Sequence, residues 1–155
     1  MAEHLHIATG DKSAKYELLY RQVVVLIEGE DDSIARMANI AAMIAQTFDF
    51  LWTGFYRVVG DELILGPFQG PMACTRIGYG RGVCGSSWAE RRIIVVDDVE
   101  KFAGHIACSS LSRSEIVVPI IRGEVILGVL DIDSEQLATF DDVDALWLAK
   151  IVDLL

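Results

Sequence analysis

Two stretches of the chain each predict a β-hairpin, and together they constrain the fold more than any other feature of the sequence. Residues 50–68 are rich in aromatic and β-branched residues, which favour strands, and the turn residues 60–62 divide them. Residues 114–121 and 124–133 form a second pair around the dipeptide Arg122–Gly123. Because the strands of a hairpin are antiparallel neighbours, we expect an antiparallel sheet.

Helical periodicity at both ends of the chain predicts the layers that cover this sheet. Apolar residues recur at helical spacing over residues 13–27 and 33–48, and a last helix is expected over residues 140–155. For this last helix Thr139 is the predicted N-cap, with Asp142 as its capping-box partner. Helices with an apolar stripe must cover a sheet face, so this order of elements predicts an α+β domain.

The segment between the hairpins, residues 66–113, departs from this regular pattern. A loop is expected over residues 69–85, a short helix over 83–90, a short strand over 93–96 and irregular chain over 97–113. Loops of such length inside a compact domain are usually functional. The chain's three cysteines, Cys74, Cys84 and Cys108, all lie in this segment.

Length and charge narrow the class of protein. The chain has 155 residues, which predicts a single domain over residues 1–155. Its 13 Lys and Arg and 23 Asp and Glu give a net charge of −10, which argues against nucleic acid and anionic membranes as partners. Neither a secretory signal nor an apolar run of ~18 residues is recognisable, so we expect a cytoplasmic protein.

The surroundings of the cysteines favour a chemical role over inert core packing, which is the usual fate of cytoplasmic thiols. Cys84 lies at the start of the predicted short helix, where the helix dipole would lower a thiol pKa. Cys108 follows His105 and precedes two serines, and Cys74 lies two residues before Arg76. These neighbours would stabilise a thiolate, so a thiol enzyme is predicted.

Two other interpretations of this segment are weaker. Residues 80–85 match the G-x-G-x-x-G pattern, but a dinucleotide site needs a preceding buried strand in a βαβ unit, and the predicted sheet is antiparallel. Zinc would have four N and S donors available: Cys74, Cys84, His105 and Cys108. Only the last two are closely spaced, whereas zinc ligands usually come in close pairs. We therefore expect neither a cofactor nor a metal.

Acidic and aromatic residues of the two hairpins add a candidate binding site. Asp131 and Asp133 project from the same face of their strand, and Glu115 would join them from across the hairpin. Partly buried acids of this kind tend to stay protonated and can then donate a proton. Trp52 and Tyr56 also share one strand face, and an aromatic wall suits an apolar methyl group.

At this point the sequence resembles the free methionine-(R)-sulfoxide reductases, which are stand-alone GAF domains. The resemblance runs from the second helix to the last and rests on six motifs: Gly66-Pro67-Phe68-Gln69-Gly70, Ala73-Cys74-Thr75-Arg76-Ile77, Gly80-Arg81-Gly82-Val83-Cys84-Gly85, Gly104-His105-Ile106-Ala107-Cys108, Ser114-Glu115-Ile116-Val117 and Gly128-Val129-Leu130-Asp131-Ile132-Asp133-Ser134. It implies a GAF-like, six-stranded antiparallel sheet flanked by helices, and a homodimer.

The resemblance also implies a role for each thiol in reducing free methionine sulfoxide. Cys108 would be the nucleophile that attacks the sulfoxide sulfur and becomes a sulfenic acid. Cys74 would then form a disulfide with Cys108, which thioredoxin would reduce, and Cys84 would be a secondary resolving thiol. Ser109 departs from the family, which often has an acid directly after the nucleophile.

Substrate contacts follow from the same resemblance. Glu115, Asp131 and Asp133 would bind the substrate's amine and sulfoxide oxygen, with Glu115 and Asp133 counted among the catalytic groups. Trp52 and Tyr56 would hold its methyl end. The alternative is a non-catalytic GAF module that binds a small ligand as a sensor. Such modules usually carry an output domain, and a binder has less need of three neighbouring thiols.

Overall fold

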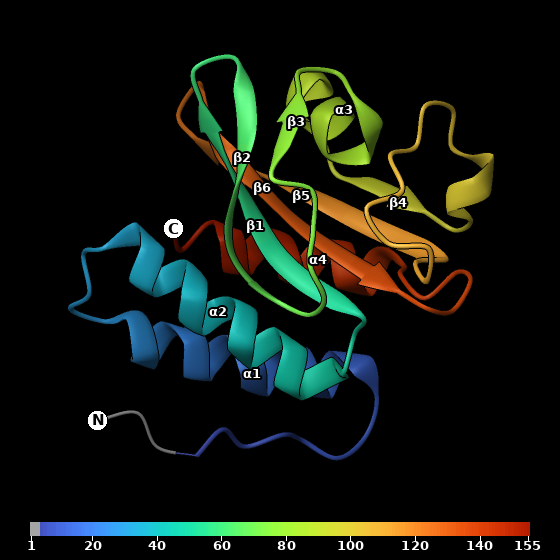
Figure 1. Ribbon diagram of the computed structural model, residues 1–155. Coiled ribbons are helices and arrows are strands. Elements are labelled where there is room, and N and C mark those ends of the chain that lie inside the picture. Colours follow the sequence, from blue (N-terminus) through green and yellow to red (C-terminus); the bar gives the residue numbers. More distant parts are fainter. Residues whose placement is uncertain (1–3) are drawn as a thin grey trace.

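The computed structural model describes residues 4–155 as a six-stranded antiparallel sheet with helices on both faces (Figure 1). The strand order is β3-β2-β1-β6-β5-β4. The predicted α+β class and the six-stranded sheet are thus confirmed. No helix of the described part of the chain is both long and apolar enough to cross a bilayer. The expectation that no secretory signal is present rests partly on residues 1–3, which lie outside the described residues.

Both predicted hairpins form, and they meet at the centre of the sheet. The first consists of β1 (Trp52–Val59) and β2 (Glu62–Gln69), and the second of β5 (Ser114–Arg122) and β6 (Val125–Ser134). β1 and β6 pair antiparallel between them. Alternation along these central strands sends residues such as Phe55 and Leu130 to one face, and Tyr56 and Val129 to the other.

Two short strands complete the edges. β4 (Ile94–Val96) lies where a strand is predicted and pairs with β5. β3 (Arg76–Gly78) pairs with β2 inside the stretch predicted to be a loop, so that prediction is wrong for these residues. Three residues are too few to display a strand period, and pairing with β2 rather than local sequence makes them a strand.

The helices divide unequally between the two faces of the sheet. α1 (Lys12–Ile27), α2 (Ser33–Phe48) and α4 (Asp142–Val152) lie on one face and form the larger apolar core with it. α3 (Gly82–Glu90) and the 3-10 turn η1 (Val99–Lys101) lie with the opposite face, where a smaller core forms. The second face is thereby only partly covered, which leaves room for a pocket.

The helix caps correct two predictions. α4 begins later than expected: Asp141 is its N-cap and Asp144 its capping-box partner, in place of Thr139 and Asp142. The hydroxyl of Thr139 lies instead 2.6 Å from the hydroxyl of Ser134, which holds it in the preceding loop. Both pairs have the same spacing in sequence, and only this tertiary contact distinguishes them. α1 likewise starts at Lys12, capped by Asp11, rather than at Ser13.

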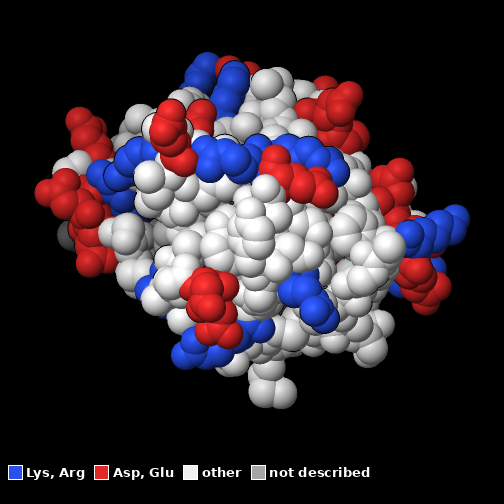
Figure 2. All heavy atoms as spheres, turned by 90° about the horizontal axis from the view of Figure 1, so that it is seen from above, with Lys and Arg blue, Asp and Glu red and all other residues white. Residues whose placement is uncertain are grey.

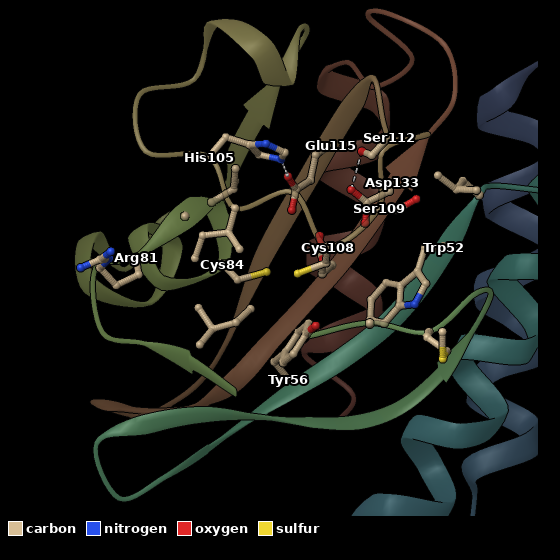
Figure 3. A pocket seen from close by; sticks show the side chains of 18 residues that line it. Trp52, Tyr56, Arg81, Cys84, His105, Cys108, Ser109, Ser112, Glu115 and Asp133 are labelled. Atoms are coloured by element: carbon tan, nitrogen blue, oxygen red, sulfur yellow. Dashed lines mark hydrogen bonds and ion pairs between the residues drawn. The ribbon is translucent and has the colours of Figure 1, made fainter. Parts of the chain in front are cut away.

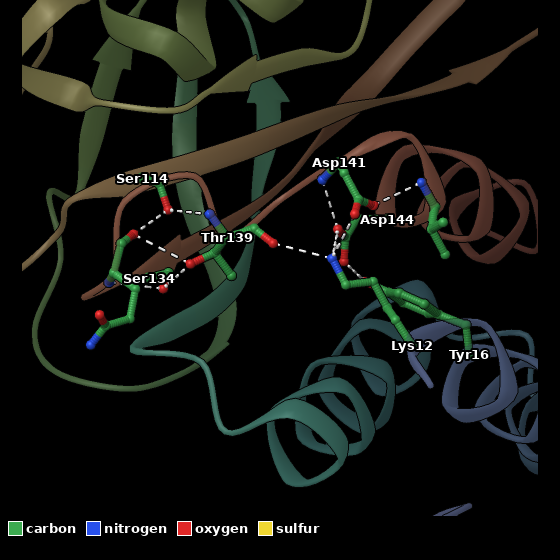
Figure 4. Close-up of polar contacts among 9 residues, drawn as sticks. Lys12, Tyr16, Ser114, Ser134, Thr139, Asp141 and Asp144 are labelled. Atoms are coloured by element: carbon green, nitrogen blue, oxygen red, sulfur yellow. Dashed lines mark hydrogen bonds and ion pairs between the residues drawn. The ribbon is translucent and has the colours of Figure 1, made fainter. Parts of the chain in front are cut away.

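A buried polar contact joins the first and last helices (Figure 4). Tyr16 donates a hydrogen bond of 2.6 Å to Oδ1 of Asp144, whose side chain is fully buried. Nζ of Lys12 lies 2.6 Å from Oδ2 of the same carboxylate and donates to the carbonyl of Thr139. The carboxylate is therefore neutralised and hydrogen-bonded, as a buried charge must be.

Charges of both signs are mixed on the surface that Figure 2 shows, which is the molecule seen from above in the view of Figure 1. Acidic and basic side chains alternate around a centre that carries neither. The net charge of −10 is thus not concentrated as one acidic field on this face.

Candidate active site

A pocket lies on the partly covered face of the sheet, between the central strands, α3 and the loop that precedes β5 (Figure 3). Seven of the eight residues predicted for the site line it; the eighth, Cys74, is bonded to one of these seven. The lining residues among them are Trp52, Tyr56, Cys84, Cys108, Glu115, Asp131 and Asp133. Residues far apart in sequence thus meet where the structure leaves the sheet open.

Strand register brings the acids together. Asp133 on β6 lies opposite Glu115 on β5 and opposite Trp52 on β1. Asp131, two residues earlier, projects from the same face and lies opposite Gly54. The predicted convergence of the three carboxyl groups is confirmed, and an aromatic ring lies beside them on the neighbouring strand.

Burial keeps these acids protonated to unusually high pH. Burial, and next the charge of Asp133, raise the pKa of Glu115 to about 8. Burial raises the pKa of Asp131 well above its usual range, and the charge of Glu115 adds to the effect. The same two causes, burial and the charge of Asp131, raise the pKa of Asp133. The cluster can therefore donate protons at neutral pH.

Trp52 and Tyr56 form the aromatic wall predicted for the site. Their rings stack with centroids 5.9 Å apart, and both side chains are almost fully buried. Trp52 donates a hydrogen bond to the carbonyl of Pro71, and Tyr56 donates one of 2.8 Å to the carbonyl of Cys74. The aromatic wall thus also holds the segment that carries Cys74.

Cys74 and Cys108 are joined by a disulfide, with their α-carbons 5.5 Å apart. They are 34 residues apart in sequence, on the loops before β3 and before β5. Cys108 is exposed and also lines the pocket, so the bond lies at the pocket's edge. This is the pairing that the family resemblance implies.

The pKa of the Cys84 thiol is the opposite of what the sequence predicts. Cys84 does lie near the start of α3, but the thiol is buried and its pKa is raised, not lowered. Burial is the largest cause, followed by the charges of Asp131 and Glu115. Desolvation and the neighbouring acids raise the thiol pKa by more than the helix dipole lowers it. The sequence shows where the helix begins, but not the burial or the acids. Cys84 is therefore a protonated thiol at neutral pH, while the disulfide removes Cys74 and Cys108 from the zinc set considered above.

The sequence does not predict three features of the site: the role of Ser112, the contact that His105, named above only as a neighbour of Cys108 and a possible zinc donor, makes with Glu115, and the role of Gly54. Ser112 donates a hydrogen bond of 2.8 Å to Oδ1 of Asp133, which orients that carboxyl group. Nε2 of His105 lies 3.6 Å from Oε2 of Glu115 in a largely buried contact, and burial lowers the pKa of this histidine. Gly54 makes room for the Trp52 ring. The first two belong to irregular chain with no periodicity, so no pattern could have linked them to the acids.

The chain's similarity to known proteins agrees with this site. Residues 32–155 match the GAF domain family. The chain is 52% identical to GAF domain-containing protein A of Dictyostelium discoideum, with 100% of the chain and 99% of that protein covered. It is 43% identical to the free methionine-R-sulfoxide reductase of Escherichia coli, covering 92% of the chain and 87% of that protein.

A solved structure extends the match to three dimensions. The free methionine-R-sulfoxide reductase of Neisseria meningitidis, determined in complex with its substrate, superimposes with a TM-score of 0.95 at 50% identity. The match covers 97% of this chain and 92% of that one. The chain thus has a GAF domain, this disulfide and a similarity to free methionine-R-sulfoxide reductases that extends over nearly the whole length of both proteins. It belongs to the free methionine-R-sulfoxide reductase family.

Proposed function

We propose that this protein reduces free methionine-(R)-sulfoxide to methionine with its own thiols. One observation carries the proposal: a disulfide between Cys74 and Cys108 lies at the edge of a pocket that holds three protonatable acids and two aromatic rings. A sulfoxide needs a thiolate for its sulfur, a proton for its oxygen and an apolar surface for its methyl group. The pocket provides a group for each.

The thiols act in sequence. The Cys108 thiolate attacks the sulfoxide sulfur, the oxygen is transferred, and methionine and a Cys108 sulfenic acid result. The Cys74 thiol then attacks the sulfenic acid, so that water leaves and the disulfide forms. A dithiol reductant returns both cysteines to thiols by exchange. Cys84, which is buried and protonated, supports this cycle as a secondary thiol.

The three acids have different roles toward the substrate. Glu115 and Asp133 supply protons to the sulfoxide oxygen, because burial raises the pKa of both carboxyl groups, that of Glu115 to about 8. Asp131, whose Oδ1 has no hydrogen-bond partner in the described structure, binds the substrate's ammonium group. Trp52 and Tyr56 enclose the methyl end, and His105 and Ser112 position Glu115 and Asp133.

The cellular setting belongs to the same proposal. Thioredoxin is the reductant we expect, since the disulfide it must reach includes the exposed Cys108. We further propose a single GAF domain over residues 1–155, a homodimer and a cytoplasmic location. Sedimentation would test the dimer, and replacing thioredoxin with a monothiol in the turnover assay would test the reductant.

Substrate choice provides the decisive experiment. Turnover should be measured with free methionine-(R)-sulfoxide, with its (S) epimer, and with an N-acetylated, C-amidated derivative. We expect the free (R) form to be reduced and the blocked derivative to be rejected, because the acids are arranged for a charged amine. Equal rates with the blocked derivative would contradict the proposal.

A ligand-binding sensor is the second candidate, and the same assay separates it from an enzyme. A sensor would bind the free amino acid without releasing methionine, even when supplied with reduced thioredoxin. The disulfide at the pocket favours an enzyme over a sensor, because ligand binding alone does not require a redox-active bond between the two loops.

A further inference from the structure

Three side chains of the pocket come together in an arrangement that suits another kind of ligand. The sulfur of Cys84 and one carboxyl oxygen each of Glu115 and Asp131 lie within 4.8 Å of one another. All three residues are buried, and they reach the pocket from α3, β5 and β6. Figure 3 shows the thiol of Cys84 turned into the pocket. Potential ligand atoms from three elements therefore surround one point.

The spacing of these atoms fits a metal ion. In tetrahedral zinc sites the metal lies about 2.0–2.3 Å from each ligand, so two ligand atoms are no more than about 4 Å apart. Side-chain movements of about an ångström or less would bring the three atoms to that separation. Mg²⁺ and Ca²⁺ prefer six or more oxygen ligands, whereas a thiolate selects a softer ion such as Zn²⁺.

A separate observation indicates that the point favours positive charge. Asp131 is only 7% exposed and lines the pocket, yet its Oδ1 has no hydrogen-bond donor in the described structure. A buried oxygen in this state has lost its hydrogen bonds to water without gaining any from the protein, and a bound cation would compensate for that loss. Asp133 lies nearby on the same strand face. Arg81 also lines the pocket, but Figure 3 shows its guanidinium turned away from these acids.

We propose that Cys84, Glu115 and Asp131 form a binding site for a divalent cation that binds thiolates, such as Zn²⁺. Binding of this ion would inhibit the enzyme. Binding releases the protons of the thiol and the carboxyl groups and replaces them with one metal ion. Inhibition rests on the proposed function, because there the same acids hold the substrate. Binding of the ion does not rest on it.

Co²⁺ is a suitable probe, because a cobalt–thiolate bond absorbs in the near ultraviolet. In the oxidised protein the disulfide leaves Cys84 as the free thiol of the described residues, so the band can be assigned. We expect about one Co²⁺ to bind with this band, which Cys84→Ser should abolish. Asp131→Asn should weaken binding by at least about tenfold. Asp61→Asn, the same change at an exposed acid, should bind as the wild type does.

Either of two results would overturn the site: a band that persists in Cys84→Ser, or no band in the folded wild-type protein. Cobalt binding is measured without turnover, so the two proposals can fail separately. Inhibition is tested by single-turnover release of methionine from the reduced protein, which should fall as Co²⁺ is added; undiminished release at saturating Co²⁺ would refute it. A protein that shows the band and releases no methionine keeps the metal site and loses the reductase function. A protein that reduces the sulfoxide without showing the band keeps the function and loses the metal site.

Discussion

The indole ring of Trp52 lies across the α-carbon of Gly54, two residues further along β1. A β-carbon at residue 54 would come within 2.5 Å of Cη2 of that ring and 2.9 Å of Cζ3. It would also collide with Cβ of Phe68, the partner of Gly54 on β2. The absence of a side chain at residue 54 therefore decides where one wall of the pocket lies.

Gly54→Ala should displace the Trp52 ring and so weaken the contact between this ring and the substrate's methyl group. Aromatic contacts of this kind are worth about 0.5–1.5 kcal/mol, so we expect KM to rise roughly 2- to 12-fold with a smaller change in kcat. Steady-state kinetics and tryptophan fluorescence would measure both effects. Gly78→Ala is the control, since a β-carbon there meets only the flexible side chain of Arg81. An unchanged KM in Gly54→Ala would remove Trp52 from the binding site.

Removal of the acidic protons should slow the chemistry. Glu115→Gln and Asp133→Asn should each lower turnover by roughly 10²-fold, the usual effect of losing a general acid. Asp131→Asn should act mainly on KM, because we assign it to the ammonium group. Asp61→Asn serves as the control at an exposed acid. Wild-type kinetics in the first two variants would mean that these carboxyl groups take no part in proton transfer.

The thiols should separate by role in a quenched single turnover. Cys108→Ser should release no methionine, because it lacks the nucleophile. Cys74→Ser should release about one equivalent and then stall with thioredoxin, since its sulfenic acid has lost the partner that forms the disulfide. Cys84→Ser should lose less activity. Mass spectrometry of the alkylated protein would identify each product, and methionine release by Cys108→Ser would refute the assignment of the nucleophile.

Stability should depend on pH through Glu115. Its pKa is raised from 4.5 to about 8, so between these values the folded protein holds a proton that the unfolded chain has lost. The free energy of unfolding should therefore fall as the pH rises through this window. Glu115→Gln should reduce that fall and be relatively more stable at pH 8, as measured by urea denaturation. Glu124→Gln, the same change at an exposed acid, is the control.

The contact between the terminal helices should matter for stability alone. Tyr16→Phe removes the hydrogen bond to the buried Asp144 and should lower the free energy of unfolding by roughly 1–3 kcal/mol. Tyr79→Phe, at a side chain that is 60% exposed, should have little effect. Turnover of folded Tyr16→Phe should remain normal, because the contact lies across the sheet from the pocket.

Much of the fold follows from local patterns in the sequence. Apolar spacing identifies α1 and α2, and aromatic and β-branched stretches with turn residues identify both hairpins. A period of two also places Asp131 and Asp133 on one face, as it does Trp52 and Tyr56. The motifs around the cysteines and acids carry the family resemblance. These features can be predicted from the sequence because each depends on residues close together in the chain.

Only the tertiary structure decides what depends on distant neighbours. β3 exists because β2 pairs with it, and α4 begins at Asp142 because Ser134 holds Thr139 in the preceding loop. The pKa of Cys84 is set by burial and by Asp131 and Glu115, which outweigh the helix dipole visible in the sequence. Desolvation and strand register arise only when the chain is packed, so no local pattern contains them.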